Sequence, residues 1–418
     1  MFESFWFSRR RALPRTGRSR PPQSSQARRP GTRLALEPLE ARTLLTSYMA
    51  ATVADLIAAI NAANAAVGSN TITLTAPTTS PYVLTAVDNA TDGPTGLPVI
   101  SGGGKKGAAD NLTIVGNGDA IERSTASGTP DFRLFDVALG AALTLNNLTL
   151  QGGHELGSGS SAEGGGLYNQ GTLVLSAVTV QNNGAVGSDG KPSTNKNSGG
   201  AGADAAGGAI WSSGALTCAN GTVIQDNFAM GGNGGSAGYG PGSYGGNGGN
   251  ALGGGVCIAG GTANLSGTSL SANNAQGGQG GQGVFFYDGS EHGGNSGNGE
   301  GGGLFVAGGI VTLSGDTIAN NGAWGDVAGT LDARDGTGFG GGLYVAGGSA
   351  TLCNDTVESN SAHGGVGGGM YIASGATVYI DTAAVDTVDP SVVSNNTDGS
   401  GTNGSTANID GSYILRNC

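Results

Sequence analysis

Short alternations of apolar and polar residues run through most of this 418-residue chain, at the period of two that β-strands require. Glycine, proline or asparagine separates the runs, so the pattern predicts many short strands joined by tight turns. The earliest predicted strands are Thr71–Leu74, Tyr82–Leu84, Leu112–Val115, Phe132–Val137 and Leu143–Leu150.

From Gly164 onward the pattern becomes a repeat that opens on glycines, continues through short strands and closes on an asparagine. The opening glycines are Gly164, Gly207, Gly253, Gly301, Gly340 and Gly367. The closing residues of the first five units, 19, 20, 21, 20 and 20 positions later, are Asn183, Asn227, Asn274, Asn321 and Asn360. Successive openings lie 43, 46, 48, 39 and 27 residues apart, so the length varies mainly after each asparagine. We expect these glycine-rich insertions to leave the repeat at one corner, as flexible or glycine-packed surface loops.

A repeat of this size predicts an all-β fold, a right-handed parallel β-helix with three short strands in each turn. Stacking the turns produces two adjacent columns. One is aliphatic and is assigned to the interior: Leu167, Ile210, Val256, Leu304, Leu343 and Met370. The next is largely aromatic and faces outward, where it either binds sugar rings or is covered by the insertions: Tyr168, Trp211, Cys257, Phe305, Tyr344 and Tyr371.

The closing asparagines predict a polar ladder at a tight corner. Asparagine accepts left-handed dihedrals, and its amide can hydrogen-bond to the asparagines above and below. The predicted ladder is Asn183, Asn227, Asn274, Asn321, Asn360 and Asn396. The opening glycines serve the other bend, where a Cβ would clash or φ must be positive. Both roles are structural.

Residues Val53–Ala65 carry apolar side chains at helical spacing, which predicts an amphipathic helix that covers the open end of the solenoid core. The stretch from Asp55 to Asn64, followed by Gly68 and Thr71, resembles the N-terminal module of many bacterial β-helix surface proteins. Ile57 stands where that family usually has an arginine. The repeats from Gly164 to Asn396 resemble those of bacterial polymorphic outer-membrane and adhesin-type proteins.

The chain begins with a basic segment that differs sharply from the rest. Ten arginines and three glutamates give the first 42 residues a net charge of +7, whereas eight basic and 27 acidic residues give the remainder −19. A low apolar content predicts disorder here. Leu36–Leu45 resembles a short sorting segment of surface proteins from planctomycete-type bacteria, although a short amphipathic helix would fit it too. We therefore divide the chain into 1–47 (disordered sorting segment), 48–110 (cap and first strands) and 111–418 (β-helix with glycine-rich insertions).

Charge, hydropathy and cysteine spacing limit the classes of partner and binding site that we expect. The acidic body lacks the basic surface that nucleic acid requires, and no run of about 20 apolar residues predicts a transmembrane helix. The four cysteines, Cys218, Cys257, Cys353 and Cys418, contain no metal-binding spacing. They are expected to be buried thiols, or to include one disulfide in an exported protein.

Candidate catalytic groups are few. Asp326, Asp332, Arg334 and Asp335 cluster within one insertion, either as a solvated loop or as the site of a polysaccharide lyase or glycoside hydrolase of pectate-lyase-like fold. His154, His292 and His363 are expected to be surface imidazoles without carboxylate partners. No cofactor is predicted, and the insertions lack the regular aspartates of calcium-binding repeats.

These patterns favour an exported cell-surface or extracellular β-helix with a structural, adhesive or carbohydrate-contacting role. Its expected partners are carbohydrates or cell-surface components, and the sequence carries no information on oligomeric state. The alternative is the lyase or hydrolase with its site at Asp326–Asp335.

Overall fold

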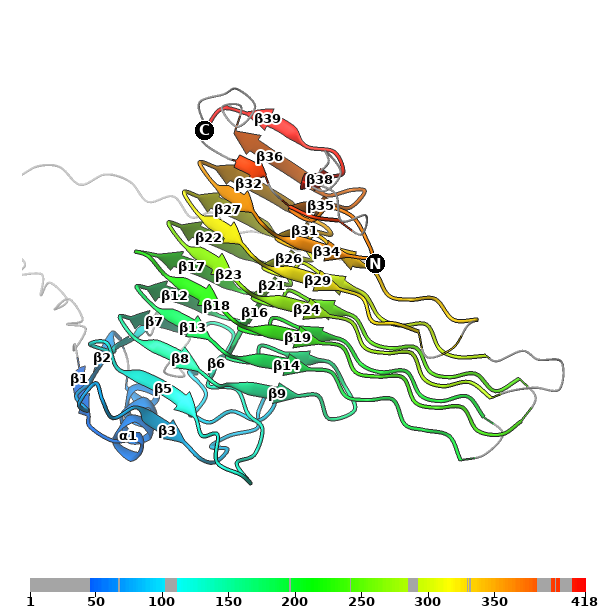
Figure 1. The fold of residues 1–418 in the computed structure, drawn as a ribbon. Helices are drawn as coiled ribbons and strands as arrows, with labels where there is room; N and C mark the ends of the chain where they lie inside the picture. The colour runs from blue at the N-terminus through cyan, green and yellow to red at the C-terminus, as the bar shows by residue number, and fades with distance from the viewer. Residues whose placement is uncertain are drawn as a thin grey trace, which may run out of the picture. The chain divides into compact units, whose positions relative to one another are not determined.

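The computed structural model describes residues 46–66, 68–101, 111–194, 197–240, 242–284, 292–328, 330, 332–381, 392–394, 396–398 and 408–418. The basic N-terminus and the sorting-like segment Leu36–Leu45 lie outside these residues. The described residues form a parallel β-helix with one α-helix at its N-terminal end (Figure 1). The predicted all-β solenoid is confirmed.

The helix α1 (Val53–Ala65) has the predicted bounds and covers the end of the core. Its capping box joins Thr52 and Asp55, because the Thr52 hydroxyl accepts the Asp55 N–H at 3.2 Å and the Asp55 carboxylate accepts the Thr52 N–H at 3.1 Å. Leu56 and Ile60 face the core and are fully buried. A strand not predicted, β1 (Thr46–Ala50), precedes the helix, so the predicted segment 1–47 extends two residues into folded structure.

Each complete turn contributes strands to five parallel sheets, named S1 to S5 in the order in which the chain meets them after the glycines. Sheet S1 contains β6 (Phe135–Val137), β11 (Leu167–Asn169), β16 (Ile210–Ser212), β21 (Val256–Ile258), β26 (Leu304–Val306), β31 (Leu343–Val345), β35 (Met370–Ile372) and β38 (Ile409–Asp410). Sheet S2 contains β1, β2 (Asn70–Leu74), β4 (Asn111–Val115), β7 (Ala142–Asn146), β12 (Thr172–Ser176), β17 (Ala215–Ala219), β22 (Thr262–Ser266), β27 (Ile310–Ser314), β32 (Ser349–Cys353), β36 (Thr377–Asp381) and β39 (Ile414–Arg416). Sheet S3 contains β3 (Tyr82–Leu84), β5 (Ala120–Arg123), β8 (Thr149–Gln151), β13 (Thr179–Gln181), β18 (Val223–Gln225), β23 (Ser269–Ser271), β28 (Thr317–Ala319), β33 (Thr356–Glu358) and β37 (Val392–Ser394).

The other two sheets flank the insertions. Sheet S4 contains β9 (His154–Leu156), β14 (Gly184–Val186), β19 (Phe228–Met230), β24 (Asn274–Gln276), β29 (Gly322–Trp324) and β34 (Ser361–His363). Sheet S5 contains β10 (Ala162–Glu163), β15 (Ala205–Ala206), β20 (Ala251–Leu252), β25 (Gly299–Glu300) and β30 (Gly338–Phe339). The expectation of three strands per turn is therefore wrong. The extra strands have two or three residues and are rich in alanine and glycine, so they carry almost no strand signal.

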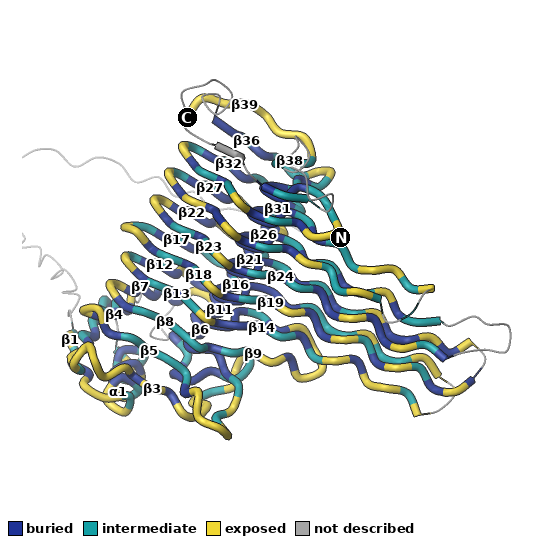
Figure 2. The backbone as a smooth tube through the Cα atoms, viewed as in Figure 1, coloured by how far each residue is buried: buried dark blue, intermediate teal, exposed yellow. Residues whose placement is uncertain are grey.

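The two predicted columns lie in register on S1. Every member of the aliphatic column is fully buried in the main core (Figure 2). The aromatic column points the other way, toward S5, where Ala206 and Leu252 pack against it. Tyr168 and Phe305 are buried, and Trp211 stacks on Tyr168 with the ring centroids 4.6 Å apart. This column therefore forms part of a second, small core instead of an open aromatic stripe.

The asparagine ladder exists, but one predicted member is wrong. The ladder runs in the order Asn183, Asn227, Asn273, Asn321, Asn360 and Asn396. From Asn227 onward, the Oδ1 atom of each residue accepts both the backbone N–H and the amide N–H of the ladder asparagine before it. Asn273 takes the place assigned to Asn274, which instead begins β24. The left-handed dihedral belongs to the residue before each of the first five ladder asparagines, namely Asn182, Asp226, Ala272, Asn320 and Ser359.

The opening glycines adopt the predicted positive φ, for example +69° at Gly164 and +70° at Gly253. The glycine that follows lies against sheet S4 across the same turn. A Cβ at Gly254 would lie 2.3 Å from the Asn274 carbonyl carbon. Only glycine satisfies both positions.

The glycine-rich insertions, called arms 1 to 4, are residues 187–204, 231–250, 277–298 and 325–337. They leave the helix between S4 and S5 and lie one above another (Figure 1). In the described part of arm 2 the side chains point outward at every third residue, as at Asn233 and Ser236. The period of three and the glycine pairs between these residues are typical of polyproline II helices. The arms are thus ordered, glycine-packed layers over their described residues.

Backbone hydrogen bonds join these layers in two directions. The Gly234 N–H donates to Gln279 in arm 3 at 2.8 Å, and the Gly235 N–H donates to Gly200 in arm 1 at 2.8 Å. The N–H of Asn233 is satisfied by the Asp189 carboxylate at 2.7 Å. A Cβ at Gly234 would lie 1.9 Å from the Gly246 carbonyl oxygen, which explains the glycine pairs.

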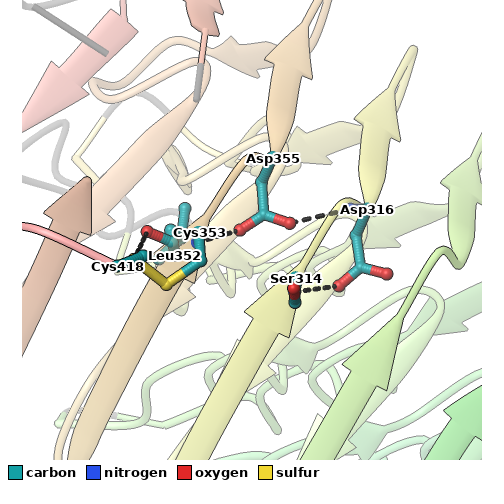
Figure 3. The surroundings of a disulfide bond; sticks show 6 residues. All are labelled: Ser314, Asp316, Leu352, Cys353, Asp355 and Cys418. Carbon is teal, nitrogen blue, oxygen red and sulfur yellow. Dashed lines mark hydrogen bonds between the residues drawn. A yellow bond between two sulfur atoms is a disulfide. The ribbon is translucent and has the colours of Figure 1, made fainter. Parts of the chain in front are cut away.

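A disulfide joins Cys353 on β32 to Cys418 beyond β39 (Figure 3). Cys218 and Cys257 are free and buried. Beside the disulfide, at the corner between S2 and S3, the carboxylates of Asp316 and Asp355 lie in adjacent turns. Asp355 accepts the Asp316 N–H at 2.8 Å. Among the described residues, no helix has the length and apolar character needed to cross a membrane.

Candidate functional site

The predicted catalytic cluster lies in arm 4, where its observed contacts are structural. The carboxylates of Asp326 and Asp335 accept backbone N–H groups of Val327 and Ala328 at 2.6 and 2.7 Å. Arg334 contributes its backbone, which bonds to Asn295 and Ser296 in arm 3. Asp332 also lies in this arm. These contacts stabilise the backbone of arm 4 and join it to arm 3.

The three histidines lie apart along the molecule. His154 differs from expectation because its Nδ1 lies 3.0 Å from the Asp131 carboxylate, which also pairs with Arg123 at 2.8 Å. His363 stacks on Trp324, and the His292 ring lies 4.9 Å from that of Tyr244. Within the described ranges, no three histidine, cysteine, aspartate or glutamate side chains come together as metal ligands.

A groove of about 360 Å³, called the Trp324 groove, crosses three turns along the asparagine corner. Strands β24, β29 and β34, which neighbour one another in Figure 1, supply much of its wall. Apart from Trp324 its lining is small or polar: Ala272, Asn273, Asn274, Asn320, Asn321, Gly322, Ser359 and Ser361. The groove thus combines one aromatic face with amide and hydroxyl groups.

The position of Trp324 follows from Gly322. A Cβ at Gly322 would lie 2.3 Å from the indole nitrogen of Trp324, so the indole rests over a residue that must lack a side chain. The ring of His363 in the next turn stacks on it, with centroids 5.0 Å apart and an angle of 22°. Trp324 remains 42% exposed. At the groove wall, the Oδ1 of Asn274 has no hydrogen-bond partner.

A second cavity of about 420 Å³, called the Arg133 cleft, lies where sheets S4 and S5 begin. Its lining residues come from the loop after β3, the residues before β6, and the strands β9 and β10 with the loop between them. They are Asp92, Gly93, Pro94, Arg133, Glu155, Ser158, Ser160, Ser161 and Glu163. Sequence reasoning did not find this cleft.

Arg133 and Glu155 form a nearly buried ion pair at the base of the cleft, with 3.2 Å between Nη2 and Oε1. Arg133 also donates to the Asp92 carbonyl at 2.5 Å, and its guanidinium lies 4.9 Å from the Tyr168 ring centroid. Burial raises the pKa of Glu155 to about 7, although Arg133 opposes the shift. Burial also raises the pKa of Glu163.

The sequence did contain one signal for this cleft. In S4 the register aligns Glu155 with Ala185, Ala229, Ala275, Ala323 and Ala362. Every later turn therefore has alanine where the first has a glutamate. The glutamate is thus specific to the turn that holds the buried Arg133, and a buried carboxyl group that lines a cleft is a candidate functional group.

No family model, curated protein or solved structure matches this chain.

Proposed function

We propose that this protein acts outside the cytoplasm, at the cell surface or in the extracellular space, as an adhesive β-helix that binds carbohydrate in the Trp324 groove. The observation that carries the proposal is the exposed indole beside a groove of amides and hydroxyls. Sugars present C–H faces that pack on aromatic rings and hydroxyls that bond to amides. An open groove across several turns also suits an extended polymer.

Three further features support the extracellular part of the proposal. The Cys353–Cys418 disulfide fits an oxidising compartment, where such bonds persist. The segment Leu36–Leu45 resembles a sorting signal of surface proteins, and the repeats resemble those of adhesin-type proteins. Cell fractionation tests localisation, because recovery of folded, reduced protein in the cytoplasm would contradict it.

A screen of the disulfide-bonded protein against neutral and acidic glycans tests the binding site. Trp324→Ala should weaken binding of the best ligand by about 2 kcal/mol, or roughly thirtyfold in Kd, the loss typical of an aromatic anchor. Tyr239→Ala is the matched control, since Tyr239 is an aromatic residue that is 83% exposed outside the groove. Equal affinities of the native protein, Trp324→Ala and Tyr239→Ala would refute the assignment of the binding site to the Trp324 groove.

The same screen addresses the enzymatic alternative. Release of unsaturated or reducing ends that disappears in Asp332→Ala would favour a lyase or hydrolase centred on arm 4. Intact glycans after prolonged incubation would favour the adhesive role.

A further inference from the structure

The Arg133 cleft has an excess of negative charge that the fold does not require. Three carboxyl groups line it, those of Asp92, Glu155 and Glu163, against the single cation of Arg133. That cation is already engaged by Glu155, by the Asp92 carbonyl and by the Tyr168 ring. The cleft therefore favours a ligand that brings a positive charge, and it disfavours anionic sugars such as uronates.

Glu155 provides independent evidence for a ligand. Its side chain is only 7% exposed, and its Oε2 atom has no hydrogen-bond partner. Leaving a buried polar atom unpaired typically costs about 1 to 3 kcal/mol. Alanine occupies the corresponding position in the five later turns of S4, so the sheet itself does not need a glutamate there. The buried Arg133 pairs with Oε1, which leaves Oε2 as the atom that neither the sheet nor the ion pair explains.

The mouth of the cleft suits a hydroxylated molecule. Ser158, Ser160 and Ser161 lie on the loop that joins β9 to β10, and all three are exposed. Their hydroxyls can donate and accept hydrogen bonds. Asp92 is exposed at the same mouth, while Glu163 is half-buried.

We propose that the Arg133 cleft binds the primary ammonium group of an amino sugar. Glu163 and Asp92 contact the ammonium, Glu155 balances its charge from below, and the serines contact the sugar hydroxyls. This site is separate from the Trp324 groove, and the proposal does not depend on carbohydrate binding there.

Calorimetric titration of the disulfide-bonded full chain with glucosamine oligomers tests the proposal, with N-acetylglucosamine oligomers as the uncharged counterpart. We expect the acetylated oligomer to bind at least about tenfold more weakly, because charged hydrogen bonds are lost. Glu163→Gln should weaken glucosamine binding by a similar factor. Glu358→Gln removes a carboxylate on β33, outside the cleft, and should have little effect, which separates a specific site from attraction of a cation to an acidic protein.

Proton release gives a second readout. Because the pKa of Glu155 is about 7, an ammonium bound beside it should displace about half a proton from Glu155 at pH 7. The amine of the sugar itself exchanges protons near neutral pH, so the share that belongs to Glu155 is the difference between the native protein and Glu155→Gln. Titrations in buffers of different ionisation enthalpy measure this number. Release that persists unchanged in Glu155→Gln would contradict the role of Glu155.

These experiments distinguish the Arg133 cleft from the Trp324 groove, and an amino sugar from a polyamine as the source of the ammonium group. Equal binding of both oligomers, or equal effects of Glu163→Gln and Glu358→Gln, would overturn the proposal. Spermidine carries ammonium groups without sugar hydroxyls, and equally tight binding of spermidine would overturn the assignment to a sugar. Loss of glucosamine binding in Trp324→Ala but not in Glu163→Gln would place the ligand in the Trp324 groove instead.

Discussion

The asparagine corner offers a sharp test, because two adjacent asparagines make different contacts. Asn273 is 1% exposed, and its side chain makes four hydrogen bonds. Its Oδ1 accepts the N–H and the amide of Asn227 at 3.1 and 2.9 Å, and its Nδ2 donates to the Ile224 carbonyl and the Asn321 amide oxygen at 2.9 and 3.0 Å. At about 1 kcal/mol for each bond, Asn273→Ala should lower the free energy of unfolding by about 4 kcal/mol.

Asn274→Ala is the matched control, with the same substitution one residue along. Because the Asn274 Oδ1 has no partner, the change should alter the free energy of unfolding by less than about 1 kcal/mol. Guanidinium unfolding measures both values. Native-state hydrogen exchange should show the loss of protection in Asn273→Ala centred on β18, β23 and β28. Similar losses in the two variants, or a larger one in Asn274→Ala, would refute the ladder and its register.

Three other predictions concern stability. Burial raises the pKa values of Asp316 and Asp355 to about 6 and about 7, so the folded protein holds more protons than the unfolded chain between about pH 4 and pH 7. The free energy of unfolding should therefore fall as pH rises through this window, and Asp355→Asn should flatten the profile; a profile that rises instead would contradict the assignment. Gly234→Ala should reduce hydrogen-exchange protection across arms 2 and 3, whereas Ser236→Ala, at an outward position, should not. Reduction of Cys353–Cys418, which closes a loop of 65 residues, should cost about 4 kcal/mol and release β39 first, as amide exchange of β39 and β36 would show.

The sequence predicted the wall of the β-helix well, because stacking makes each position a column. The aliphatic column and the bounds of α1 agree with the structure, since strong periodicity and buried apolar residues determine both. Asn274 was misplaced because the third turn has Ala272 at the left-handed position, so its Asn-Asn pair is shifted by one residue. The ladder asparagine lies three residues after the buried residue of its S3 strand, as Asn227 does after Ile224 and Asn321 after Ile318. The same count from Leu270 gives Asn273.

The candidate sites were much harder to predict. Neither Trp324 nor Glu155 belongs to a local motif. Each is recognised as part of a site only from its neighbours in other turns, such as His363 stacked on the indole and the alanine column aligned with Glu155. The order in the arms was hidden for a related reason. A Gly-Gly-X run has no hydrogen-bond partner within itself. Its bonds form with the other leg of the same arm, as from Gly246 to Gly235, or with a stacked arm, as from Gly234 to Gln279.

The carbohydrate groove is tested most directly by the fluorescence of Trp324 itself. The chain has three tryptophans, so replacing Trp6 and Trp211 with phenylalanine leaves Trp324 as the only indole. Titration with the best glycan from the screen should shift its emission to shorter wavelength, with the midpoint at the Kd measured by calorimetry. Saturable calorimetric binding with unchanged Trp324 emission would place the ligand elsewhere and contradict the proposed site.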